Sequence, residues 1–188
     1  MAKLPYLAAA GSAIIFGFSF LFTKNALANL AVLQLLGLRF LLAAVFLALL
    51  RLLQIIKVEI TAAKIKGLLL VAIFQPVLYF CFETVGVNLT AASLAGVIIS
   101  LIPMVVALLA VIFLKEELSF LQWLSVLASV GGVVLVTLPS LKSGSGQLAG
   151  ILALLGAVLC GALFNIYSKR ASAVSSPVEV TYFMVWVG

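Results

Sequence analysis

Two charged residues, Arg39 and Glu83, lie inside long apolar stretches and are the first candidates for chemistry. A charge in the middle of a membrane costs at least about 2.5–3.5 kcal/mol, so each should face other helices and needs a partner. We place Arg39 about eight residues, or ~12 Å, below the outer end of its helix, at 1.5 Å per residue. Glu83 falls about a turn below the outer end of the next helix, so an Arg39–Glu83 ion pair is geometrically feasible. The two side chains either line a solute path or form a structural pair, and Arg39 could instead extend to lipid headgroups.

Glu83 also ends a line of polar side chains. Gln75, Tyr79 and Glu83 follow at four-residue spacing, which would place them on one face of a continuous helix. This line is the best candidate for a cavity lining on a single helix. A carboxyl group buried at this depth could also exchange protons, so Glu83 is the candidate for proton coupling.

Small residues and a proline mark the next apolar stretch. Ala92, Gly96 and Ser100 follow at four-residue steps, as in a stripe that allows close helix contact. Pro103 lacks an N–H group, so we expect the helix to bend there and to free the carbonyl of Ile99. Ser100 and Pro103 then either form a flexible cavity wall or serve ordinary packing.

Two more polar residues, Ser19 and Asn165, are weaker cavity candidates on other helices. A hydroxyl group such as that of Ser19 can bond back to its own helix, so packing is the default interpretation.

The residues that are missing exclude most enzymes. The chain has no His and no Asp, and its five acidic residues are all Glu. This removes Ser-His-Asp and Cys-His catalysis and His-ligated metals, and leaves a Ser-Lys or single-Glu mechanism as the formal alternative. Cys81 and Cys160 lie in apolar runs and are interpreted as reduced packing residues. We therefore predict a protein that is not an enzyme and has no cofactor and no metal.

The elements that position these residues are membrane-spanning helices. The chain is 66% hydrophobic and 9% charged, whereas a soluble domain is roughly 45–50% apolar and about 25% charged. The intervals between charges are continuous apolar runs, which favours helices over a barrel. We predict an all-α polytopic membrane protein with six transmembrane helices and a partial seventh, at residues 4–23, 30–50, 67–86, 91–114, 120–138, 148–167 and 178–188.

The basic residues predict the orientation. With the N-terminus inside, eight Lys and Arg residues fall in inside segments and two, Lys24 and Lys142, fall outside. This bias predicts a cytoplasmic N-terminus in the plasma membrane and places residues 139–147 outside. The first apolar run is longer than the 7–15 residues of a secretory signal core, so we interpret it as a retained span. The basic residues that give the net charge of +6 are too thinly spread along the chain for nucleic-acid binding.

A weak internal repeat appears at an offset of 145 residues. Residues 11–15 align with 156–160, and the Thr23-Lys24 pair aligns with Ser168-Lys169. Five spans separate the two copies, so the second copy starts from the opposite side of the membrane. Such inverted repeats are typical of secondary transporters, and this unit implies a protein of about 290 residues. We predict a first repeat over 1–138, an extracytoplasmic linker over 139–147, and a truncated second repeat over 148–188.

The sequence resembles the EamA-like branch of the drug/metabolite transporter superfamily. The stretches that carry the resemblance occur in the family's order, at residues 15–20, 38–40, 90–95, 99–103, 114–118 and 131–133. The resemblance implies a ten-helix, 5+5 inverted-repeat carrier that exports small organic metabolites, such as amino-acid-related compounds or drugs. It also implies a cavity formed largely by the first, third and fourth helices of each repeat, and about three and a half further spans.

Three rival interpretations stay open. One is a half-size exporter like the small multidrug-resistance proteins, acting as a homodimer; another is a membrane protein that transports nothing; a third is a membrane enzyme. No GxxxxGK[ST] motif is present, so ATP would have to act through another chain. The expected partners are the lipid bilayer, a small-molecule solute and protons as the coupling ion, with no nucleic acid.

Overall fold

The apolar stretches form helices because a helix satisfies every backbone hydrogen bond within one segment, as lipid demands. The computed structural model describes residues 3–59, 61–115, 117–139 and 145–188, and the regular elements in these ranges are all helical. In chain order they are α1 (Lys3–Ala26), α2 (Val32–Leu52), α3 (Ala62–Ala72), the π-helical segment η1 (Ile73–Leu78), α4 (Tyr79–Leu89), α5 (Ala92–Ile99), α6 (Ile102–Leu114), α7 (Phe120–Thr137), α8 (Ser145–Ala171) and α9 (Pro177–Val187).

The helices confirm an all-α polytopic membrane protein. In the part of the chain that the structure describes, five helical segments are long and apolar enough to cross a membrane: Val32–Leu52, Lys64–Leu89, Ala92–Phe113, Phe120–Thr137 and Gln147–Ala171. Helix α1, with 24 residues, is also long enough to cross a membrane, since a hydrocarbon core of about 30 Å needs about 20 residues at 1.5 Å each. The shorter α9 lies in the seventh predicted run.

Two helices begin at side-chain caps that the sequence encodes locally. The Ser119 hydroxyl accepts a hydrogen bond from the Gln122 N–H, while the Gln122 side chain accepts from the Ser119 N–H, and this reciprocal pair starts α7. Ser176 and Glu179 form the same arrangement at the start of α9, where Pro177 occupies the first turn. Such caps satisfy N–H groups that have no partner inside the helix.

Two of the predicted spans are broken rather than continuous. In the third span, Gln75 has extended backbone angles (φ −145°, ψ 119°) just before Pro76, and this break separates α3 from α4. In the fourth span, α5 ends at Ile99 and α6 begins at Ile102. The span is therefore interrupted next to Pro103, as expected, but as a break between two helices rather than as a bend within one. Pro103 lies in the first turn of a new helix, where its missing N–H needs no partner.

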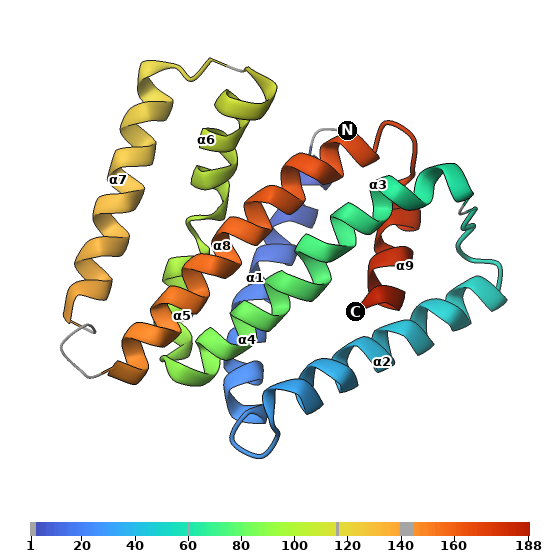
Figure 1. The fold of residues 1–188 in the computed structure, drawn as a ribbon, viewed down its shortest axis with the longest axis horizontal. Coiled ribbons are helices and arrows are strands. Elements are labelled where there is room, and N and C mark those ends of the chain that lie inside the picture. The colour runs from blue at the N-terminus through green and yellow to red at the C-terminus, as the bar shows by residue number, and fades with distance from the viewer. Residues whose placement is uncertain (1–2, 60, 116, 140–144) are drawn as a thin grey trace.

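The ends of the helices gather on two sides, as Figure 1 shows. The N-terminal end of α1, the C-terminal end of α6 and the C-terminal end of α8 lie at the top. The α1–α2 and α4–α5 connections and the start of α8 lie at the bottom. This alternation matches the inside and outside segments expected from the basic residues. Residues 140–144 of the predicted linker lie outside the described residues, and α8 already begins at Ser145 within the predicted linker.

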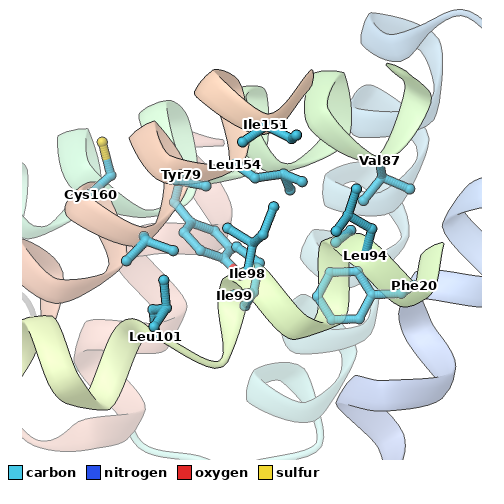
Figure 2. Packing of buried hydrophobic residues seen from close by; sticks show 13 residues of the cluster. Phe20, Tyr79, Val87, Leu94, Ile98, Ile99, Leu101, Ile151, Leu154 and Cys160 are labelled. Atoms are coloured by element: carbon cyan, nitrogen blue, oxygen red, sulfur yellow. The ribbon is translucent and has the colours of Figure 1, made fainter. Parts of the chain in front are cut away.

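Helix α8 is the central element and packs against α4 at two glycines. A Cβ atom on Gly86 would lie 2.5 Å from Cγ of Leu154, and one on Gly150 would lie 2.6 Å from Cγ2 of Thr90. Without these side chains the two backbones approach closely, which is the usual route to tight helix packing in lipid. A cluster of buried residues from α1, α4, α5 and α8 surrounds this crossing, including Leu154 and Ile98 (Figure 2).

Candidate functional site

Arg39 on α2 and Glu83 on α4 form an ion pair in the apolar part of the bundle. Nη1 of Arg39 lies 4.0 Å from Oε2 of Glu83. Both atoms are buried, and neither has a hydrogen-bond partner in the described part of the chain. The sequence-based expectation that these two side chains can meet is confirmed, because both lie at a similar depth on neighbouring helices.

The two members of this pair differ in exposure. The side chain of Arg39 is 33% exposed, whereas that of Glu83 is 1% exposed. Glu83 thus lies inside the helix packing, whereas part of the Arg39 side chain is accessible. The arrangement also explains how Arg39 is tolerated, since a paired charge in a membrane costs less than an isolated one.

An aromatic ring holds the guanidinium from a second direction. The Cζ atom of Arg39 lies 5.1 Å from the centre of the Phe80 ring, within the range of a cation–π interaction. Phe80 in turn meets Phe40 edge to face, at 5.4 Å between ring centres. Glu83 and Phe80 belong to α4, so this helix positions Arg39 through both charge and ring contact.

Cavities flank Arg39 on two sides. An open groove between α1 and α2, which we call the α1–α2 cavity, measures about 660 Å³ and is lined by Ile14, Ile15, Phe18, Ser19, Phe22, Thr23, Ala26, Leu35 and Arg39. A smaller cavity of about 280 Å³ joins α2, η1 and α9 and is lined by Arg39, Phe40, Ala43, Gln75, Pro76, Phe80, Thr181, Met184 and Val185. Arg39 therefore lies at the wall between two largely apolar spaces.

The predicted Gln75–Tyr79–Glu83 line is only partly formed. Gln75 shares the smaller cavity with Arg39, but its extended backbone removes it from the helical face of Tyr79. Tyr79 is 2% exposed and packs in the buried cluster, where its ring lies 3.3 Å from the position of a Cβ atom on Gly161 of α8. The expectation that all three share one helix face was wrong, because the α-helix is interrupted at Pro76.

Ser19 and Ser100 lie in different cavities, and both hydroxyl groups bond to their own helices. The Ser19 hydroxyl donates to the Phe16 carbonyl at 2.8 Å, and Ser19 still lines the α1–α2 cavity beside Arg39. The Ser100 hydroxyl donates to the Val97 carbonyl at 2.6 Å. Ser100 and Pro103 line a separate groove of about 720 Å³ between α1 and α5. The structure brings Ser19 to Arg39 but leaves Ser100 and Pro103 apart from it.

Asn165 is not brought to the Arg39 site. Its side chain is exposed on α8 and donates to the Gly161 carbonyl one turn earlier, at 2.8 Å. An exposed amide in a membrane helix can satisfy its donor in this way without any neighbour. This explains a polar residue on the surface of the bundle and gives it no link to Arg39.

Two polar contacts at the helix ends were missed by the sequence reasoning. Nζ of Lys24 donates to the carbonyls of Val87 (2.9 Å) and Asn88 (2.8 Å) at the end of α4. Nζ of Lys64 lies 2.9 Å from Oε2 of Glu179, which ties α3 to α9. The Glu179 carboxylate thus serves both the local cap at Ser176 and this distant partner.

The side chains of the site suit electrostatic binding rather than metal chemistry. Within the described ranges, no three His, Cys, Asp or Glu side chains gather as metal ligands would. Arg39 offers planar N–H donors, which match the two oxygen atoms of an anionic group. With Arg39 among mainly apolar lining residues, the site has the groups needed to bind and orient a small solute.

Known proteins similar to this chain are transporters by name. Residues 3–138 match the EamA-like transporter family. The uncharacterized transporter YcxC of Bacillus subtilis (strain 168) is 29% identical over 184 residues, which is 97% of this chain and 59% of the relative. The uncharacterized transporter YetK of the same organism is 30% identical over 189 residues, 97% of this chain and 57% of the relative.

An archaeal relative matches a shorter part. An uncharacterized transporter of Archaeoglobus fulgidus is 26% identical over 109 residues, 58% of this chain and 38% of the relative. The chain thus spans less than three fifths of the length of these three relatives. No solved structure matches the chain significantly.

Proposed function

Because the chain belongs to the EamA-like transporter family, we propose that it forms part of a secondary carrier that exports small organic metabolites. In this proposal residues 1–138 are a first five-helix repeat and residues 148–188 begin a second one. Residues 139–147 link them outside the cytoplasm, and the complete carrier has ten helices in the plasma membrane with a cytoplasmic N-terminus. The 145-residue offset and the greater length of the relatives support this architecture.

The observation that carries the proposal is the Arg39–Glu83 pair beside the α1–α2 cavity. A carrier needs a site within the membrane that binds a solute and is also able to release it. Arg39 supplies a partly exposed charge at such a site, and Glu83 supplies a competing charge 4.0 Å away. A purely structural role would not require the Arg39 side chain to line an apolar space of about 660 Å³.

Glu83 is also the group that we propose for proton coupling. It is the acidic residue within the six complete predicted spans, and its described charged and titratable neighbours are Arg39 and Tyr79. Proton uptake by Glu83 would release Arg39 for the solute, and proton loss would restore the ion pair. The solute and the proton would then be exchanged at one pair of side chains.

Flux through liposomes tests this function. The full-length protein is reconstituted, and efflux of preloaded L-leucine, L-threonine, indole-3-acetate and tryptamine is followed with and without a pH gradient. We expect protein-dependent efflux of at least one solute that responds to the gradient. Glu83→Gln should lower that efflux at least about tenfold, since the carboxylate that displaces the solute from Arg39 is removed.

Glu117→Gln is the matched control, because Glu117 is exposed between α6 and α7. It makes the same chemical change away from the site and should leave efflux unchanged. Flux equal to that of empty liposomes for all four solutes would contradict transport. Efflux at the same rate with and without the pH gradient would contradict proton coupling but not transport.

A further inference from the structure

Resting on the proposed function, we propose that the Arg39 site selects a solute with one anionic group, such as a carboxylate, on an apolar body. The guanidinium would bind the anionic group, and the α1–α2 cavity would hold the body. The inference concerns the charge and shape of the solute, which membership of the family leaves open.

The first step is the difference in exposure within the ion pair. A third of the Arg39 side chain is exposed, and Arg39 lines both flanking cavities. Glu83 is 1% exposed and lines neither of them. A solute in either cavity therefore contacts the side chain of Arg39 and no carboxylate.

The second step is the unused hydrogen-bonding capacity of Arg39. The 4.0 Å between Nη1 and Oε2 of Glu83 is longer than a charge-assisted hydrogen bond, for which about 2.7–2.9 Å is usual. Nη1 also has no hydrogen-bond partner among the described residues. An anionic group that takes the place of the Glu83 carboxylate can offer oxygen atoms to the guanidinium at bonding distance, and protonation of Glu83 would avoid leaving a buried carboxylate without a partner.

The third step is the lining of the α1–α2 cavity. Apart from Arg39, its walls come from aliphatic and aromatic side chains, together with the hydroxyls of Ser19 and Thr23. The Ser19 hydroxyl already donates to Phe16. A volume of about 660 Å³ fits a small organic molecule, since ligand sites measure roughly 300–1,000 Å³. These walls offer dispersion contacts to an apolar body and little to a polar one.

The fourth step is the charge balance. Arg39 is the charged member of the lining of both flanking cavities in the described part of the chain. A cationic solute would approach a guanidinium without a compensating carboxylate on the cavity wall. The site therefore disfavours cations, which separates this chain from an exporter of cationic drugs.

Binding of three matched indoles tests the inference. Indole-3-acetate, indole-3-acetamide and tryptamine share one body and carry a negative, a neutral and a positive group. Equilibrium dialysis against the full-length protein in detergent gives their dissociation constants. We expect indole-3-acetate to bind at least about tenfold more tightly than the amide, and tryptamine to bind most weakly.

Two variants locate the preference at Arg39. Arg39→Gln/Glu83→Gln removes both charges and keeps the site neutral. The dissociation constants of indole-3-acetate and indole-3-acetamide should then agree within about twofold. Arg39→Lys keeps the charge but loses the planar donors, so it should weaken acetate binding and leave amide binding unchanged. Glu117→Gln should retain the parent preference.

Several results would overturn the inference. These are equal binding of the three indoles, binding of none of them, tighter binding of the amide or tryptamine, or an acetate preference that survives in Arg39→Gln/Glu83→Gln. Protein-dependent flux of any other solute in liposomes would leave the transport function standing in each of those cases. Absence of all flux would instead remove the transport function.

Discussion

Nη1 of Arg39 lies 4.0 Å from Oε2 of Glu83, but 33% of the arginine side chain is exposed and only 1% of the glutamate. The pair is therefore asymmetric. The negative charge of Glu83 is balanced by the guanidinium of Arg39. Arg39 also contacts the ring of Phe80 and lines the α1–α2 cavity. This difference predicts unequal effects when either member is removed.

Arg39→Gln should destabilise the protein more than Glu83→Gln. Loss of Arg39 leaves a carboxylate buried without a partner, which costs about 3–5 kcal/mol in comparable buried pairs. Loss of Glu83 leaves a guanidinium that is partly exposed and should cost less. The double variant should be more stable than Arg39→Gln alone, because no unpaired charge remains. Unfolding of the four proteins in mixed detergent micelles measures these differences, and additive effects of the two changes would contradict the coupling.

Gly86→Ala and Gly150→Ala should each destabilise the crossing of α4 and α8. The new methyl group would lie 2.5 Å from Cγ of Leu154 in the first case and 2.6 Å from Cγ2 of Thr90 in the second. Overpacking of this kind typically costs about 1–3 kcal/mol. Gly132→Ala on α7 is the control, because nothing lies within 4 Å of its Cβ position. A melting temperature unchanged in all three variants would argue against the close approach of α4 and α8.

Lys64→Met should lower the free energy of unfolding by about 1.5–3 kcal/mol, the usual contribution of hydrogen bonds to charged groups. Nζ of Lys64 contacts both carboxylate oxygens of Glu179, at 3.0 and 2.9 Å, and thereby joins α3 to α9. Lys66→Met removes an exposed lysine from the same helix and should have little effect. A double-mutant cycle with Glu179→Gln gives the coupling energy between the two side chains. A coupling near zero would show that this tie does not stabilise the fold.

Cysteine labelling should place the two ends of the bundle on opposite sides of the membrane. Asn29 lies exposed in the α1–α2 turn, and Ile55 lies exposed between α2 and α3. In a background in which Cys81 and Cys160 are replaced by Ala, Asn29→Cys should react only from outside and Ile55→Cys only from the cytoplasm. The reverse pattern would invert the proposed topology, and labelling of both from one side would contradict the spanning of α2.

The sequence predicts the long-range relation of Arg39 to Glu83 because the membrane restricts depth. Each charge has a fixed distance from the end of its helix, and neighbouring helices are antiparallel, so two intramembrane charges at similar depth are natural partners. The Lys64–Glu179 pair lacks such a restriction. Both residues lie near helix ends, where water or several other groups could satisfy them, and 115 residues separate them.

The breaks in the spans show a different limit. Pro76 and Pro103 both predict an interruption, but a proline can bend a helix, end it or begin the next one. Packing decides among these outcomes. Gln75 becomes extended and faces the smaller cavity, while Tyr79 turns into the core against α8. Spacing alone had placed these two side chains on one face.

By itself, the sequence determines the membrane environment, the approximate bounds of the membrane spans, and the depth of Arg39 and Glu83, because hydrophobicity and helix length act locally along the chain. Only the tertiary structure decides which side of each helix is buried. The fit of Gly86 and Gly150 against Leu154 and Thr90 fixes the rotation of α4 and α8. That rotation buries Glu83, because close packing favours one orientation of the interlocking helices, while the packing of α2 leaves Arg39 at the α1–α2 cavity.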